Sequence, residues 1–140
     1  MDRIDKILNH DLFLYHLGRN NAAEADRRFC RHSMVNFLDV ARIGTIIALE
    51  EGLKINREWI YAAALLHDCG KHEQYENGIP HEQASARIAP EILKACGFND
   101  EETGVIVTAI SRHRDPEAAK EKNLNGILYR ADKASRACFA

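Results

Sequence analysis

The sequence predicts an all-α protein that folds as one domain over its 140 residues. Apolar residues recur at the three- and four-residue spacing of amphipathic helices, and no stretch alternates as a half-buried strand does. Residues typical of helix ends separate these stretches, without a repeat, a linker or a low-complexity segment between them. A chain of this length can bury one core of ordinary size. We therefore expect a single-domain bundle of about six to seven helices over residues 1–140.

The amino-terminal half should contain two long helices with a polar stretch between them. The polar stretch, residues 18–31, has room for a short helix. The second long helix should run from His32 to about Glu51 and end at Gly52. Its apolar residues lie on most sides, which predicts a central, buried helix. The first helix carries its apolar residues in one stripe, formed by Ile4, Ile7, Leu8, Leu12 and Tyr15.

The carboxy-terminal half should contain four helices, three of which have recognisable start signals. Asn56 is a suitable N-cap, Pro80 suits a first helical position, and Asn99 with Glu102 resembles a capping box. Gly97 is placed to close the helix that Pro80 opens. The expected helices run from Asn56 to His67, from Pro80 to about Cys96, from Asn99 to His113 and from about Asn123 to Arg136.

Composition and charge exclude several classes of protein. The net charge of −2 and the pI near 6.4 argue against binding to a nucleic acid polymer. The charged amino terminus, "MDRIDKILNHD", is unlike a signal peptide, and no apolar stretch reaches the roughly 20 residues of a membrane span. We therefore expect a cytoplasmic protein that does not bind a membrane. The four cysteines lie too far apart for a paired thiolate zinc site, namely Cys30, Cys69, Cys96 and Cys138.

Several helices carry one polar side chain on an otherwise apolar face. His67, His113 and Asp132 each extend such a face, while His32 and His81 stand at the start of two helices. Burying an unpartnered polar group costs about 2–7 kcal/mol, so these groups need hydrogen bonds or a cation. Each alone is typical of a hydrogen-bonded core, but imidazole and carboxylate are also the ligands that zinc, iron, manganese and nickel take. Periodicity alone leaves both interpretations open.

The order of these residues resembles a known family. His32, the pair at 67–68 in "ALLHDCGK" and Asp132 in "YRADKASR" resemble the H…HD…D signature of the HD-domain metal-dependent phosphohydrolases. The resemblance covers most of the chain, from about residue 28 to residue 136. It implies an all-α HD-type fold and a metal-dependent hydrolase. His81 and His113 extend it to the pattern of family members that hold two metals.

Carried over position by position, the resemblance implies a ligand set. One or two divalent or transition metal ions are expected, with two favoured, and Fe, Mn, Zn, Ni and Mg are not distinguished. Asp68 would bridge the two ions, because a carboxylate offers two oxygens. The six expected ligands are His32, His67, Asp68, His81, His113 and Asp132.

Two departures narrow the resemblance within the family. Lys71 stands three residues beyond Asp68, where the mono-metal nucleotidases have a glutamate. The Gly-Tyr-Pro extension of the cyclic-dinucleotide phosphodiesterases is absent from the sequence. The pattern is most similar to the small bacterial two-metal branch that includes symmetrical diadenosine tetraphosphate hydrolases.

The implied reaction is cleavage of a phosphate ester or anhydride of a small nucleotide-like substrate by a metal-bound hydroxide. Asp68 and Lys71 are the catalytic candidates, and the ammonium of Lys71 would act as a point charge on a phosphate. A solvated loop lysine is the alternative for Lys71. Basic residues near the ligands in sequence are further candidates for phosphate binding. With Lys71, they are Arg28, Arg112, Arg114, Lys133 and Arg136.

Two other functions remain open. Other HD-fold proteins with the same six-ligand pattern resemble di-iron oxygenases. Some HD-fold modules act in signalling without catalysis. Lys71 and the nearby arginines favour a small phosphorylated substrate, and the presence of all six candidate ligands counts against a purely structural module. An oligomer is compatible with the sequence.

Overall fold

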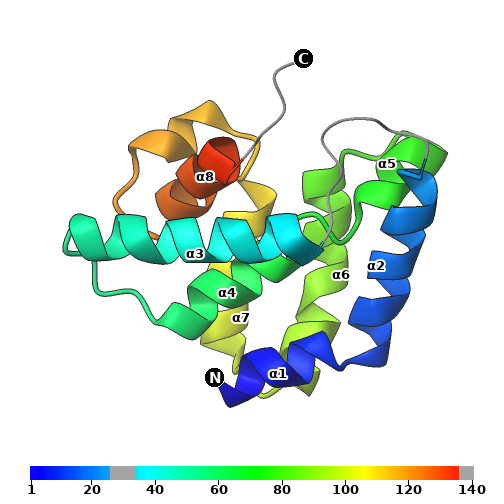
Figure 1. The fold of residues 1–140 in the computed structure, drawn as a ribbon, viewed down its shortest axis with the longest axis horizontal. Helices are drawn as coiled ribbons and strands as arrows, with labels where there is room; N and C mark the ends of the chain where they lie inside the picture. Colours follow the sequence, from blue (N-terminus) through cyan, green and yellow to red (C-terminus); the bar gives the residue numbers. More distant parts are fainter. Residues whose placement is uncertain (26–33, 136–140) are drawn as a thin grey trace.

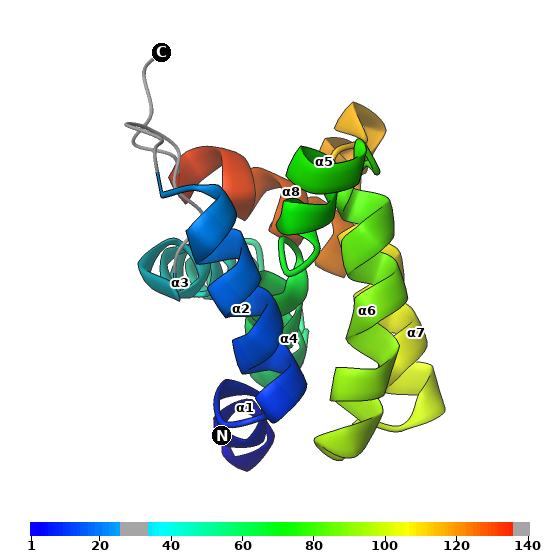
Figure 2. The same cartoon turned by 90° about the vertical axis from the view of Figure 1, so that its right-hand side faces the viewer.

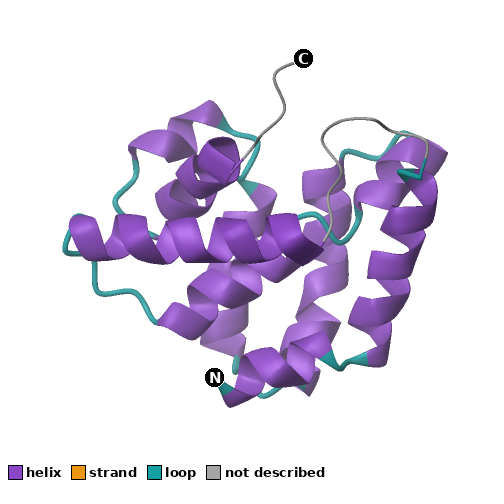
Figure 3. Cartoon of the chain, viewed as in Figure 1, coloured by secondary structure: helices purple, strands orange, loops and turns teal. Residues whose placement is uncertain are grey.

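The all-α prediction is confirmed by the computed structural model, which describes residues 1–25 and 34–135. Within these residues the chain forms eight α-helices and one short 3-10 helix, and no strand (Figure 3). In chain order they are α1 (Asp2–Leu8), α2 (Asp11–Ala23), α3 (Met34–Glu50), α4 (Arg57–Leu66), α5 (Lys71–Asn77), α6 (His81–Ala95), α7 (Asp100–Ser111), η1 (Pro116–Lys120) and α8 (Leu124–Ser135).

Helix α4 lies at the centre of the bundle. It contacts α1, α3, α6, α7 and α8, and every residue from Ala62 to Leu66 is fully buried. Helix α3 crosses α4 and α8, as Figure 1 shows, and α6 lies alongside α7 (Figure 2). Helix α2 packs against α5. The carboxy-terminal end of α4 therefore points into the interior, where the polar residues of the 67–68 pair follow it.

Helix α3 differs from the central helix that its composition predicts. Val35, Ile46 and Leu49 are 68%, 54% and 76% exposed. Its buried face consists of Phe37, Val40, Ala41, Gly44 and Ala48. The prediction of a central helix is wrong for α3, because hydrophobicity on every side does not say which sides find a partner.

Two further differences raise the number of helices. The expected first helix is divided at His10, whose side chain caps α2 by accepting a hydrogen bond from the amide of Leu12. Helix α5 was not expected, since "KHEQYEN" has no apolar stripe. It ends at Gly78, whose φ of 72° is the left-handed conformation that glycine adopts easily.

The predicted start signals agree well with the structure. Asn56 caps α4, and the capping box of Asn99 and Glu102 is present at α7. Pro80 is the N-cap of α6 rather than its first residue. The expected outer ends at His32 and Arg136 lie outside the described residues. None of the described helices is long and apolar enough to cross a bilayer.

Candidate metal centre

Five of the six expected ligands meet in the interior. His67 ends α4, Asp68 lies in the turn before α5, and His81 is the first residue of α6. His113 follows α7, and Asp132 lies within α8. Each is at most 3% exposed. The sixth, His32, lies outside the described residues.

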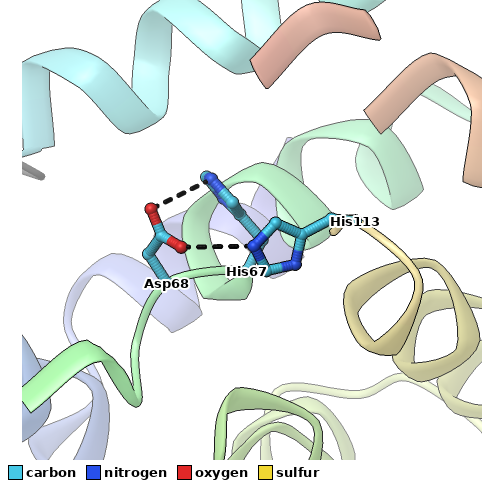
Figure 4. Close-up of side chains that lie close together, drawn as sticks. All are labelled: His67, Asp68 and His113. Atoms are coloured by element: carbon cyan, nitrogen blue, oxygen red, sulfur yellow. Dashed lines mark ion pairs between the residues drawn. The ribbon is translucent and has the colours of Figure 1, made fainter. Parts of the chain in front are cut away.

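The carboxylate of Asp68 is the centre of this cluster. Its Oδ2 lies 3.3 Å from His67 Nε2, and its Oδ1 lies 3.4 Å from His113 Nε2 (Figure 4). The same Oδ1 lies 3.3 Å from His81 Nε2. On the other side, Asp132 Oδ1 lies 3.4 Å from His67 Nε2. The two oxygens of Asp68 thus face two different groups of side chains.

The orientation of each histidine is set by an oxygen at its Nδ1. His67 Nδ1 lies 2.6 Å from the carbonyl of Ala64, and His113 Nδ1 lies 2.6 Å from the carbonyl of Ile110. A carbonyl only accepts, so both Nδ1 atoms carry the proton and donate. In a neutral imidazole this leaves the lone pair on Nε2, which faces Asp68.

The position of the proton on the His81 ring follows from two hydrogen bonds to the side-chain amide of Gln74. Gln74 Oε1 accepts a hydrogen bond from the backbone amide of His81 at 2.9 Å and lies 2.7 Å from His81 Nδ1. Because Oε1 accepts in both bonds, Nδ1 of His81 donates. As neutral rings, all three histidines would therefore present an Nε2 lone pair to the same point, which is the orientation of histidine ligands in metal sites.

This arrangement requires a positive charge between its members. His81 Nε2 and His113 Nε2 lie 3.0 Å apart, with their Nδ1 protons already used. His67 Nε2 is buried and has no hydrogen-bond partner in the part of the chain that the structure describes. A shared cation removes both problems, and nitrogen with carboxylate oxygen is a donor set that transition metals accept. The residues present fit a metal ion.

The pKa values of the cluster also indicate that it requires a positive charge. Burial lowers the pKa of His67, but the carboxylates of Asp68 and Asp132 outweigh it and raise that pKa to about 9. Burial would raise the pKa of Asp132, but His67 lowers it to about 2. Burial and the nearby Lys71 lower the pKa of His81 to about 3. Without a metal ion the cluster thus holds an ionised carboxylate at Asp132, a neutral imidazole at His81 and a protonated imidazole at His67, and a metal ion that binds there would replace the proton of His67.

Comparison with known proteins identifies the family. The model described as the HD domain matches residues 35–137. The chain belongs to the HD domain family. The predicted family is thereby confirmed, while the branch of symmetrical diadenosine tetraphosphate hydrolases stays a prediction.

Two proteins illustrate what this HD domain is similar to. An uncharacterized protein of Clostridium beijerinckii is 49% identical over 140 residues, which are 100% of this chain and 87% of the relative. The crystal structure of a predicted HD superfamily hydrolase from an uncultured Thermotogales bacterium matches with a TM-score of 0.66 and 26% identity. That match covers 86% of this chain and 66% of the other, so this HD domain spans about two thirds of that protein's length.

Lys71 is buried beside the cluster. Its side chain is 8% exposed, which contradicts the alternative of a solvated loop lysine. Nζ lies 3.4 Å from His81 Nδ1 and 5.9 Å from the centre of the Tyr75 ring. A cation at this place adds positive charge on the outer side of the His81 ring.

The remaining basic candidates of this HD domain have different surroundings. Arg112 forms ion pairs with Asp115, at 3.1 Å, and with Glu121. Arg114 and Lys133 are exposed, and Nζ of Lys133 lies 5.5 Å from the centre of the Tyr129 ring. Two more candidates lie outside the described residues, namely Arg28 and Arg136.

Two residues that serve the centre were missed from the sequence. Gln74 fixes the His81 ring from α5, and Asn20 of α2 bonds to the backbone on both sides of the turn that carries Asp68 and Lys71. Gln74 gives no signal in sequence, because its contact depends on the turn between α5 and α6. Asn20 gives a weak one, since it stands four residues from His16 on one side of α2.

Proposed function

We propose that this chain is a metal-dependent phosphohydrolase that cleaves a phosphate ester or anhydride of a small nucleotide-like substrate. Membership of the HD domain family and the likeness to a predicted hydrolase support metal-dependent hydrolysis. The observation that carries the proposal is the convergence of three Nε2 atoms on the carboxylate of one buried aspartate, with a second carboxylate beside it. A structural core gains nothing from this arrangement, because burying so many polar groups without a cation costs stability.

The ligands divide into two groups around Asp68. His67 and Asp132 lie on the Oδ2 side, while His81 and His113 lie on the Oδ1 side. This division supports two ions: His67 and Asp132 would hold one, His81 and His113 would hold the other, and Asp68 is within reach of both groups. His32 is assigned to the first group by the family pattern alone. Iron and manganese suit this mixed nitrogen and oxygen set, as do zinc and nickel.

The side chains have separate roles in the proposed reaction. A bound metal would supply an activated water and neutralise negative charge on the phosphoryl oxygens. Asp68 and the histidines hold that chemistry in one place, and Gln74 and two backbone carbonyls keep the rings oriented. Lys71 extends the positive charge past His81 and would bind a phosphate oxygen. Arg114 is exposed and directly follows the candidate ligand His113, so its charge would attract an anionic substrate.

The test combines metal analysis with a substrate screen. Protein purified without chelator should contain a transition metal and release phosphate from a nucleotide or a dinucleoside polyphosphate. Asp68→Asn keeps the side-chain shape but removes the charge, so it should lower metal affinity and reduce activity at least 100-fold. Glu101→Gln also removes one negative charge, but at an exposed residue of α7, so this variant should behave as wild type.

The outcomes separate the alternatives. Phosphate release that persists in Asp68→Asn would contradict the proposal. Oxygen consumption with an iron chromophore and no phosphatase activity would favour the oxygenase. A folded protein that binds no metal would favour the signalling module.

A further inference from the structure

Helix α2 presents a buried polar stripe to α5. His16, Asn20 and Glu24 stand four residues apart, on one side of the helix and its C-cap, and are 9%, 0% and 2% exposed. Polar groups are costly to bury, so a helix that carries three of them at this spacing needs specific partners. The family match begins at residue 35, so this stripe lies outside the matched HD domain.

Each member of the stripe has its partner in or next to α5. His16 Nδ1 lies 2.8 Å from His72 Nε2, and the two rings stack at 5.1 Å. Glu24 Oε2 accepts a hydrogen bond from the Tyr75 hydroxyl at 2.9 Å. Asn20, between them, bonds to the main chain at Asp68 and His72. The stripe thus holds α5 at three points.

Asn20 uses both ends of its amide on the turn of the metal centre. Its Nδ2 donates to the carbonyl of Asp68 at 2.9 Å, and its Oδ1 accepts from the amide of His72 at 2.8 Å. The turn between these groups carries the Asp68 carboxylate and Lys71. Two bonds from one rigid, fully buried side chain therefore fix the backbone from which both side chains project.

The reason that this support comes from another helix is visible at Gly70. Gly70 is the N-cap of α5, so it has no side chain to satisfy the first amides of that helix. A Cβ at this position would lie 2.7 Å from the Cβ of Ala84 and 2.7 Å from the amide of Ser85. The close approach of α6 thus excludes an ordinary capping residue, and Asn20 supplies the missing acceptor from α2.

We infer that Asn20 is a positioning residue of the metal centre: it holds the turn of Asp68 and Lys71 in place from a helix outside the matched family domain. The inference rests on the proposed function, because it gives Asp68 the role of a ligand. Loss of an outer partner of a metal ligand usually costs 10- to 100-fold in metal affinity or activity. Asn20→Ala removes both bonds, whereas Asn20→Asp keeps the acceptor for His72 and removes the donor to Asp68.

The experiment measures Mn²⁺ binding by calorimetry and, separately, the kinetics at limiting and at saturating Mn²⁺. Both Asn20 variants should raise the Kd for Mn²⁺ about 10- to 100-fold. Their kcat should recover in part when Mn²⁺ is raised, because the metal pulls the turn back into place. Asn20→Asp preserves side-chain volume and decides the result if Asn20→Ala does not fold.

Two controls on α2 separate positioning from stability. Asn21→Ala changes an exposed neighbour, and Phe13→Leu removes packing from a fully buried side chain seven residues before Asn20. Phe13→Leu should lower the Tm but leave the Kd for Mn²⁺ within twofold of wild type, as should Asn21→Ala.

The outcomes are distinguishable. Asn20 variants that bind Mn²⁺ within twofold of wild type overturn the inference alone. An equal loss of affinity in Phe13→Leu also overturns it, since general destabilisation would then explain the effect. A wild-type protein that binds no Mn²⁺ overturns the proposed function and this inference together.

Discussion

Two of the candidate ligands form the same hydrogen bond at the end of a helix. His67 and His113 each donate from Nδ1 to the carbonyl three residues earlier, which is one of the last carbonyls of α4 and of α7. Carbonyls in the last turn of a helix lack some of their intrahelical partners, so a bond from the ring helps to satisfy the helix end and orients the ring at once. The carbonyl of Ile110 also accepts a hydrogen bond from the amide of His113 at 3.3 Å. A histidine just past the end of a buried helix therefore presents its Nε2 lone pair to the interior without further support.

The two-ion arrangement makes a prediction for His113. His113→Ala removes a ligand from the group that faces Asp68 Oδ1 and leaves His67 and Asp132 in place. The metal content should fall from two ions to one, and activity should fall at least 100-fold, while the far-UV circular dichroism stays unchanged. Metal analysis after gel filtration measures the content.

The matched control for this prediction is His10→Asn. His10 lies outside the cluster and caps α2, a position that asparagine also fills well. This variant should keep the full metal content. An unchanged content in His113→Ala would contradict two ions and favour one ion held around His67.

At the scale of elements, one arginine joins three helices at the base of the bundle. Arg3 of α1 forms ion pairs with Glu58 of α4, at 2.9 Å, and with Glu102 of α7, at 2.8 Å. Its guanidinium also lies 4.1 Å from the centre of the Phe98 ring. Glu102 accepts a further hydrogen bond from Trp59 Nε1 at 2.7 Å. The carboxylate that closes the capping box of α7 thus also anchors α1.

The stability of this junction should depend on pH in a defined window. The bonds from Arg3, with those from Trp59 and the Asn99 amide, lower the pKa of Glu102 from 4.5 to about 2. A lowered pKa means that the folded state favours the ionised form. The contribution is therefore complete above pH 4.5 and is lost as the pH falls toward 2.

Glu102→Gln tests this window. The substitution should lower the free energy of unfolding by about 1–2 kcal/mol at pH 7, because it weakens charge-assisted hydrogen bonds that are mostly shielded from water. Urea denaturation at pH 7, 5 and 3.5 should show a constant difference from wild type at the first two values and a smaller one at the third. Glu101→Gln is the matched control, and a difference that grows at pH 3.5 would contradict the assignment.

At the scale of the whole molecule, the sequence predicts which side chains face inward but not how close they come. The 3.6-residue period places His67, His113 and Asp132 on buried faces, and all three are buried. It says nothing of the distance between α4, α7 and α8, which depends on how the helices cross. The meeting of these residues at Asp68 was expected from the family pattern rather than from periodicity.

The features that the sequence did not predict depend on contacts between elements rather than on a local pattern. Helix α5 has no apolar stripe, because it is held by polar contacts to α2 rather than by a hydrophobic face. The exposed face of α3 escaped because its apolar residues look the same in sequence whether or not another helix covers them. Contacts such as those of Asn20 and Gln74 join elements far apart in space and leave no periodic trace. Prediction was reliable where a signal is local, as at the caps of α4 and α7.

The converging ligands also predict how metal affects the stability of the whole fold. The candidate ligands come from α4, from α6, from α8, from the turn before α5 and from the end of α7, so a metal at this centre would link most of the bundle. An unfolded chain does not hold these residues together, and a ligand that binds only the folded state stabilises it by mass action. At a Mn²⁺ concentration 100-fold above its Kd the gain is about 2.7 kcal/mol for one site. For a domain of this size that gain corresponds to about 10 °C in Tm.

Thermal unfolding followed by circular dichroism, with and without Mn²⁺, measures the shift, and Asp68→Asn should show a much smaller one. Mg²⁺ at the same concentration is a control for ionic strength, since a hard cation that prefers oxygen ligands should bind the imidazole cluster weakly. An equal rise in Tm for wild type and Asp68→Asn would show that Mn²⁺ acts elsewhere on the protein, and the assignment of the buried cluster as the metal centre would then be wrong.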